Sequence, residues 1–295
     1  MSPGKNNLIA IAFVCTSAYF CAATVGALSK FLSSQISIAM ILFFQSTTCM
    51  LLLLPQLLRK GWKNLKTQKI KLHLARDLAG LLSFFCFFYS LETIPLVDGI
   101  LLQSTGPLWL PLLTFFWLRS KMKGHLWWGI VIGFIGILLI LKPGIVPLSL
   151  GLVSALLSGI FSGFTLIAVN KLSDTEPIYR ILFYYFLVGS VVSGLFALFQ
   201  FSMPTWKDLF FLMCLGIFTF LAQTCVTYAI RQGKPDILAP IAYSVVIYSG
   251  FYDWLIWQKI PDLITLTGVL LVVCGAIFSI YFEKRYRRKS LLLNP

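Results

Sequence analysis

Residues 147–169 read PLSLGLVSALLSGIFSGFTLIAV, a stretch without one charged side chain. A helix needs about 20 such residues to cross the hydrocarbon core of a bilayer, because lipid cannot satisfy backbone polar groups. Nine further apolar stretches of similar length occur, so the sequence predicts an all-α membrane protein with ten transmembrane helices. The predicted spans are 8–28, 36–58, 75–93, 97–118, 125–142, 147–169, 180–201, 209–230, 236–257 and 263–282.

The composition excludes a soluble globular protein. Of 295 residues, 58% are apolar and only 12% are charged, and the mean hydropathy is +0.87. A soluble chain of this length needs a charged exterior, and this chain lacks the residues to build one. The apolar residues also gather in long blocks, which is typical of membrane spans.

The net charge of +14 is distributed unequally along the chain. If the N-terminus lies in the cytoplasm, only four of the 24 basic residues fall in outer segments. This bias places both termini in the cytoplasm, in a multi-pass protein of the inner membrane. The basic stretches 59–76 and 284–289 are interpreted as topology signals that touch anionic membrane lipid, and not as a nucleic-acid surface. The four outer basic residues are Lys30, Lys142, Lys207 and Lys259.

Neither a signal peptide nor a metal site is indicated. The apolar run after Lys5 is longer than a signal-peptide h-region of about 7–15 residues, so it is kept as a mature span. His73 and His125 lie near the cytoplasmic ends of different spans, and no metal or cofactor is expected. The cysteines show no CxxC spacing and are interpreted as buried, unpaired apolar residues. They are Cys15, Cys21, Cys49, Cys86, Cys214, Cys225 and Cys274.

The second half of the chain repeats the first. A single shift places Tyr89 on Tyr228 and Gly136 on Gly275, and nearly the same shift places Ser17 on Ser158. The near-constant offset through five consecutive spans indicates a duplication. It divides the chain into a first repeat at 1–143, a second at 144–283 and a basic tail at 284–295.

A repeat of five spans has a geometric consequence. Five is odd, so the second copy enters the membrane from the opposite side, and the two halves are inverted. Inverted repeats are characteristic of secondary transporters, because exchanging the conformations of the halves moves a cavity's opening from one side to the other. A duplicated membrane protein that transports nothing is the alternative.

Several motifs resemble the drug/metabolite transporter superfamily of the EamA type. They are Gly106-Pro107; Gly129, Gly133 and Gly136 followed by 141–144; Ala239-Pro240-Ile241-Ala242-Tyr243; Trp254; Ile260-Pro261-Asp262; and Gly268. The resemblance covers nearly the whole chain. It implies ten helices, both termini inside, a central cavity, and transport of small metabolites such as amino acids, amines or S-adenosylmethionine.

The chain departs from the family at positions that bear on substrate choice. Family members commonly carry a Glu after spans 4 and 9, where this chain has Ser120 and Lys259. An Arg that is often found early in span 2 is replaced by Gln45, and one before the span 9 tyrosine by Ala242. Substrate rules from other branches therefore do not transfer to this chain.

Small polar residues form stripes on two predicted helices. Ser154, Ser158, Ser162 and Thr165 share one face of span 6, and Ser17, Cys21 and Thr24 repeat this pattern in span 1. Polar groups inside spans usually face the bundle interior or a water-filled cavity. Close helix packing by small residues is the alternative, and one stripe can serve both purposes.

Asp253 is identified as the carboxylate lying well inside a predicted span, with Thr114 as its repeat partner. We expect it to couple transport to protons or to act as counter-ion for a cationic substrate. Snorkelling to the outer interface beside Trp254 and Trp257 is the alternative. The predicted substrate pathway is Ser17, Gln45, Tyr89, Gln103, Thr114, Ser158, Ser162, Gln223, Thr227, Tyr243 and Asp253.

Other functional classes lack their motifs. Hydrolase elbows, His-Glu-x-x-His pairs and Walker-A loops are absent from the sequence, so an enzyme is not expected. Filter-like loops of an ion channel are also absent. The sequence predicts a transporter that moves a small organic metabolite by alternating access, as a monomer or homodimer. A non-transporting scaffold or receptor subunit is the alternative.

Overall fold

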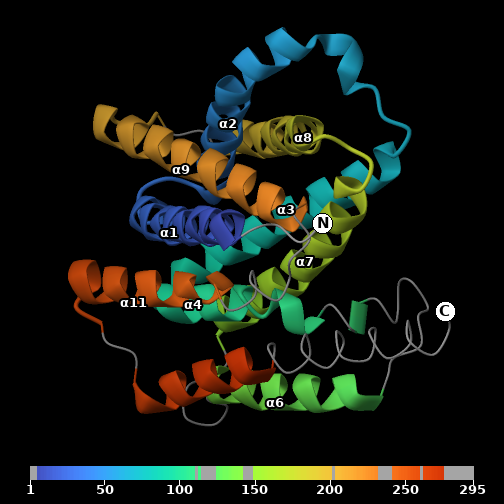
Figure 1. The fold of residues 1–295 in the computed structure, drawn as a ribbon. Coiled ribbons are helices and arrows are strands. Elements are labelled where there is room, and N and C mark those ends of the chain that lie inside the picture. The colour runs from blue at the N-terminus through green and yellow to red at the C-terminus, as the bar shows by residue number, and fades with distance from the viewer. Residues whose placement is uncertain are drawn as a thin grey trace, which may run out of the picture.

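The computed structural model describes residues 5–109, 112–113, 124–141, 149–200, 203–231, 241–259 and 262–275, and every regular element in these ranges is a helix (Figure 1). The first half holds α1 (Lys5–Ser33), α2 (Ile38–Lys60), the short 3₁₀ helix η1 (Trp62–Leu65), α3 (Ile70–Leu91), α4 (Leu96–Gln103) and α6 (Gly124–Leu141). The second half holds α7 (Leu150–Ser173), α8 (Ile178–Phe199), α9 (Trp206–Arg231), α11 (Ser244–Trp257) and the apolar helix Leu263–Gly275.

Helix covers the described part of almost every predicted span. Two boundaries differ in an informative way: the span predicted at 75–93 begins at Ile70, and the one predicted at 97–118 is interrupted after Gln103. Local chemistry explains several starts, since Pro95 and Pro177 precede α4 and α8, and the Ser149 hydroxyl accepts from Leu152 N at 3.2 Å. The tail at 284–295 lies outside the described residues.

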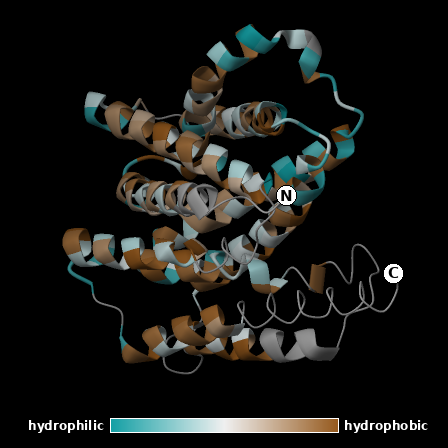
Figure 2. Cartoon of the chain, viewed as in Figure 1, coloured by the Kyte–Doolittle hydropathy of each residue, from teal (hydrophilic) through white to brown (hydrophobic). Residues whose placement is uncertain are grey.

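Apolar residues run along all the helices (Figure 2). Within the described part of the chain, five helices are long and apolar enough to cross a membrane: α2, α3, α7, α8 and α9. Large apolar side chains stand exposed on them, including Phe199 at 87% and Phe196 at 63%. Water would penalise such a surface, whereas lipid tails solvate it. The chain is therefore a multi-pass membrane protein.

The helices pack in a pattern that is nearly unchanged when the two halves are exchanged. The most extensive contacts join α3 to α7, α2 to α8 and α1 to α9. If α1 is exchanged with α7, α2 with α8 and α3 with α9, the α3–α7 contact becomes the α9–α1 contact. The α2–α8 contact is unchanged by this exchange. The contact of α4 with α7 likewise has its counterpart in α11 with α1, and that of α2 with α9 in α8 with α3.

Glycines allow a further pair of helices, α6 and Leu263–Gly275, to make a direct backbone contact. In α6, a Cβ added at Gly136 would lie 2.7 Å from the carbonyl oxygen of Gly268 and 2.8 Å from the nitrogen of Val272. A Cβ added at Gly268 would lie 2.9 Å from the carbonyl oxygen of Gly136. The helix Leu263–Gly275 therefore lies directly on α6, at the lower edge of the bundle in Figure 1. Membrane helices commonly approach each other in this way through small residues.

This contact yields a stability prediction. We expect Gly136→Ala to lower the free energy of unfolding by about 1–3 kcal/mol, because backbone atoms cannot yield to the added methyl. Gly250→Ala is the matched control, since no atom lies within 4 Å of its Cβ position. There the alanine should gain roughly 0.5–1 kcal/mol through its higher helix propensity. Thermal denaturation in detergent, followed by tryptophan fluorescence, separates the two; equal melting temperatures would contradict the prediction.

Candidate functional site

Buried hydroxyl groups with no partner in the described part of the chain lie on α9 and at the start of α11, two helices that both pack on α1. Tyr243, at the start of α11, is 7% exposed, and its hydroxyl has no hydrogen-bond partner among the described residues. The same holds for the hydroxyls of Ser244 and Thr224. Tyr19 of α1 lies close enough to interact electrostatically with Tyr243, and it packs against Cys15. Buried polar groups are normally paired, so open hydroxyls indicate a place for a polar ligand or water.

The predicted pathway residues fall into two groups around this place. Thr227 is 1% exposed, and Tyr89 packs in the same apolar cluster as Tyr19. Several others are half-buried; they are Ser17, Gln103, Ser162 and Gln223. Thr114 lies outside the described residues. Of the predicted pathway residues, Tyr243 thus lies near Tyr19, and Tyr89 packs on the apolar cluster that Tyr19 also contacts.

Ser158 serves helix packing. It is fully buried, and its hydroxyl donates to the Ala155 carbonyl within α7 at 2.6 Å. Its own carbonyl accepts from the Ser83 hydroxyl of α3 at 2.9 Å. One turn further, Ser162 lies against Gly106, where an added Cβ would come within 3.0 Å of the serine oxygen. The stripe on α7 therefore lets α3 and α4 approach closely, as the packing alternative expected.

Gln45 lines a small pocket between α2, α3 and α8. It is 3% exposed, and its Oε1 has no hydrogen-bond partner among the described residues. The volume of about 10 Å³ holds roughly one water molecule, too little for a metabolite. The pocket is lined by Leu42, Gln45, Ser46, Cys49, Leu81, Tyr185, Phe186 and Gly189.

Asp253 is fully buried in α11 and paired on both oxygens. Its Oδ1 lies 3.3 Å from Lys30 Nζ at the end of α1, and its Oδ2 accepts from Val97 N at 2.7 Å, in the first turn of α4. The Lys30 ammonium also lies 4.6 Å from the centroid of the Trp257 ring. Snorkelling toward the interface is therefore wrong for Asp253, because its carboxylate joins three helices in the interior.

A second buried carboxylate, Asp77, escaped the sequence analysis. It is 1% exposed in α3, beside Arg76 at 1% and His73 at 0%. The interpretation of Arg76 as a topology signal on the lipid headgroups is wrong, because its side chain is buried. The basic stretch 59–76 was treated as one surface segment, whereas α3 begins at Ile70 and takes these residues inside. Their spacing of three and four, which places them on one helix face, could have revealed the cluster.

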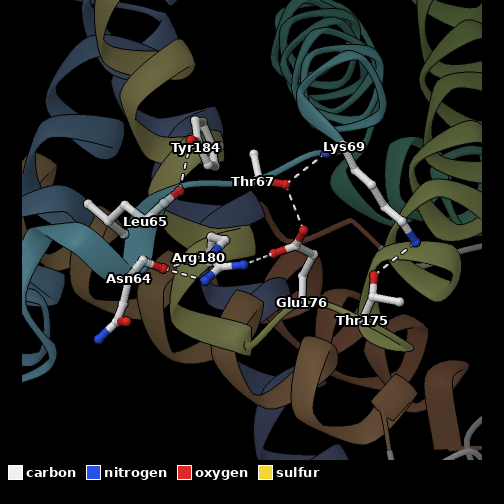
Figure 3. Close-up of polar contacts among 8 residues, drawn as sticks. All are labelled: Asn64, Leu65, Thr67, Lys69, Thr175, Glu176, Arg180 and Tyr184. Carbon is white, nitrogen blue, oxygen red and sulfur yellow. Dashed lines mark hydrogen bonds and ion pairs between the residues drawn. The ribbon is translucent and has the colours of Figure 1, made fainter.

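A polar network joins the α2–α3 connection to the turn between α7 and α8 (Figure 3). Glu176 accepts from the Thr67 hydroxyl at 2.6 Å and pairs with Arg180, which also donates from Nε to the Asn64 carbonyl at 2.8 Å. Lys69 Nζ donates to the Thr175 hydroxyl at 2.9 Å. Burial raises the pKa of Glu176, but hydrogen bonds from Thr67 and Arg180, with the charges of Arg180 and His73, lower it below its ordinary value overall.

The cysteines are free thiols. Cys15, Cys21 and Cys49 are buried, as expected, whereas Cys86, Cys214 and Cys225 are only half-buried. Cys274 is exposed on the helix Leu263–Gly275, so the expectation of burial is wrong for it. Among the described residues, no group of three His, Cys, Asp or Glu is placed to hold a metal ion.

Comparisons with known proteins agree with this architecture. The pseudopaline exporter CntI of Pseudomonas aeruginosa is 29% identical over 262 residues, covering 88% of this chain and 92% of the relative. The S-adenosylmethionine uptake transporter of Rickettsia bellii is 27% identical over 264 residues, covering 90% and 91%. A solved crystal structure superimposes with a TM-score of 0.66 at 15% identity, covering 96% of this chain and 99% of the other, so the two share a fold.

The sequence model of the EamA-like transporter family matches the chain twice, over residues 8–142 and 149–281. The protein is thus a small-molecule transporter and not an enzyme. Because the two matches together account for most of its length, the chain belongs to the EamA-like transporter family.

Proposed function

We propose that the protein is a ten-span secondary transporter that moves a small organic metabolite across the inner membrane by alternating access. Its spans form two inverted five-helix repeats, 1–143 and 144–283, with both termini in the cytoplasm. The observation that carries the proposal is the set of helix contacts that survives exchange of the halves, such as α3 with α7 and α9 with α1. The two family matches, one in each half, support it.

Contacts between the halves lie at opposite ends of the bundle, as alternating access requires. Asp253 of the second half holds Lys30 and Val97 of the first, near the start of α2. Beyond the other end of α2, Glu176 and Arg180 of the second half hold Thr67 and Asn64 of the first. We call these the outer closure and the inner closure, following the predicted topology. Opening one while keeping the other exposes a central cavity to one side.

The chemistry of the α1–α9–α11 region supports an amino acid, an amine or an S-adenosylmethionine-like compound as substrate. The open hydroxyls of Tyr243, Ser244 and Thr224 offer neutral hydrogen-bonding groups, and the rings of Tyr19 and Tyr243 offer π faces to a cationic group. One similar protein is named for export of pseudopaline and another for uptake of S-adenosylmethionine, so kinship leaves the direction of transport open.

Reconstitution into proteoliposomes tests the transport proposal. We expect saturable uptake of one class from a panel of labelled amino acids, amines and S-adenosylmethionine. Tyr243→Phe should raise the half-saturating concentration about fivefold, the effect of one hydrogen bond of about 1 kcal/mol. Tyr228→Phe is the matched control, because this tyrosine is 40% exposed on the outside of α9 and should change nothing. Absence of saturable flux through correctly inserted protein would favour the scaffold or receptor alternative.

The outer closure gives a second test. The sequence assigns Asp253 to proton coupling or to the role of counter-ion for a cationic substrate, and that assignment stays a prediction. The contacts instead indicate that Asp253 holds the two halves together. Asp253→Asn should slow transport, because Lys30 loses its carboxylate partner in the interior. Transport by this variant should still depend on a pH gradient. Removing that charge as well, in Asp253→Asn with Lys30→Met, should restore part of the rate. Loss of gradient dependence at a normal rate would instead make Asp253 the coupling group.

The inner closure predicts a pH-dependent stability. Because the pKa of Glu176 is lowered in the folded protein, its contribution is present above the ordinary glutamate pKa and is lost as pH falls through the folded value. Glu176→Gln should therefore cost about 1–3 kcal/mol at pH 7 and little in acid. Melting temperatures measured across pH, with exposed Asp174→Asn as the control, check this. A difference between wild type and Glu176→Gln that does not change with pH would contradict it.

A further inference from the structure

Two of the buried carboxylates, Asp253 and Asp77, differ in how completely they are paired. Asp253 uses both oxygens, one with Lys30 and one with Val97 N. Asp77 uses one: its Oδ1 lies 3.3 Å from NH1 of Arg76, and its Oδ2 has no hydrogen-bond partner among the described residues. A proton can therefore join Asp77 at Oδ2 without displacing an existing contact, whereas on Asp253 it would break one.

Further unpaired polar atoms surround Asp77. Nε of Arg76 and both ring nitrogens of His73 have no hydrogen-bond partner among the described residues, although both side chains are buried. His73 lies one turn before Asp77 on the same face of α3. Interiors rarely leave so many donors and acceptors open in one place. The arrangement indicates a site that exchanges water or protons.

Arg76 is held independently of Asp77. Its guanidinium carbon lies 3.8 Å from the centroid of the Tyr185 ring, on α8. The ring reaches α3 because position 80 is glycine: an added Cβ there would lie 2.9 Å from Tyr185 Cε2. The cation–π contact keeps the arginine in place whether Asp77 is charged or neutral. Protonation of Asp77 would therefore leave a supported positive charge, and not an isolated one.

Tyr185 also borders the pocket that contains Gln45. Its unpaired Oε1 can hold a single water, since the cavity of about 10 Å³ is the size that one water needs. His73 in turn lies against the ring of Tyr184 in a tilted contact, with 4.7 Å between the centroids, and it interacts electrostatically with Glu176. Tyr184 and Glu176 belong to the inner closure (Figure 3). The cluster thus extends from the inner closure into the bundle. The titratable and charged groups around it are Cys49 of α2, His73 and Arg76 of α3, Arg180, Tyr184 and Tyr185 of α8, and Glu176.

We propose that Asp77 is a proton-binding site, reached from the inner closure through His73, and that it is the coupling carboxylate of transport. A proton from cytoplasmic water adds to Oδ2 and gives the neutral acid, while Arg76 keeps its charge over Tyr185. Return of the proton to water restores the carboxylate. The coupling role rests on the proposed transport function; proton binding by Asp77 does not.

Carboxyl labelling tests proton binding without any substrate. Dicyclohexylcarbodiimide reacts with carboxylic acids in their protonated form in apolar surroundings, and peptide mass spectrometry locates the product. We expect labelling of Asp77 that falls as pH rises, and no labelling of Asp253, which is equally buried but fully paired. Denatured protein serves as the control that the reagent and the peptide mapping work at both positions. Failure to label folded Asp77 at any pH, or labelling that does not change with pH, would overturn the proposal.

Transport assays then test the coupling role on the compound class found in the panel. Asp77→Asn should lose accumulation driven by a pH gradient but keep exchange of labelled for unlabelled substrate, and Asp77→Glu should recover gradient-driven accumulation. A merely structural residue would lose exchange and accumulation together. Asp208→Asn is the matched control, since this buried carboxylate accepts from Thr205 at the start of α9, and both activities should persist. Accumulation by Asp77→Asn equal to that of wild type would remove the coupling role while leaving the transport proposal intact.

Discussion

Lipid offers no hydrogen-bond partner to a polar group, and most of this molecule follows from that constraint. Helices satisfy the backbone internally, so every regular element in the described part of the chain is a helix. Apolar side chains such as Phe199 can cover the exterior, because the surrounding solvent is itself apolar. Polar side chains must then be paired inside, as Ser83 and Ser158 are, or left open where a ligand or water completes them, as the hydroxyl of Tyr243 is.

The same constraint changes what holds the helices together. Apolar burial gains little when the alternative is lipid, so close backbone packing becomes decisive. Gly136 and Gly268 bring two helices into direct contact, and Gly80 admits the Tyr185 ring to α3. Because contacts in one half have counterparts in the other, a rearrangement that opens one end has a matching rearrangement at the other end. This is the mechanical basis of the proposed alternating access.

A buried charged group in such a bundle either holds helices together or exchanges a proton. The two kinds differ in how many of their polar atoms already have a partner. Both carboxylate oxygens of Asp253 have a partner, one with Lys30 and one with a backbone amide, and the residue joins the halves at the outer closure. Within the described part of the chain, Asp77 has a partner on only one of its two oxygens, and that partner, Arg76, also lies over the ring of Tyr185. Burial alone would not distinguish the two, since both side chains are almost completely removed from the surface.

The sequence by itself determined the class of fold, the position of nearly every helix and the family, because long apolar runs and motifs such as Gly106-Pro107 are local signals. It also identified Gln45, Tyr243 and Asp253 as interior polar residues, since a polar side chain in an apolar run has few other places to lie. Only the tertiary structure decided which polar groups are paired, because their partners come from distant helices. Asp253 is paired with Lys30 and Val97, and Arg76 lies over the ring of Tyr185. Asp77 escaped prediction for the same reason. The spacing of His73, Arg76 and Asp77 places them on one helix face, but it does not say whether that face is buried. A charge at the edge of an apolar run belongs to the surface or to the interior according to where the helix begins and what packs on it, and here the ring of Tyr185 packs on it.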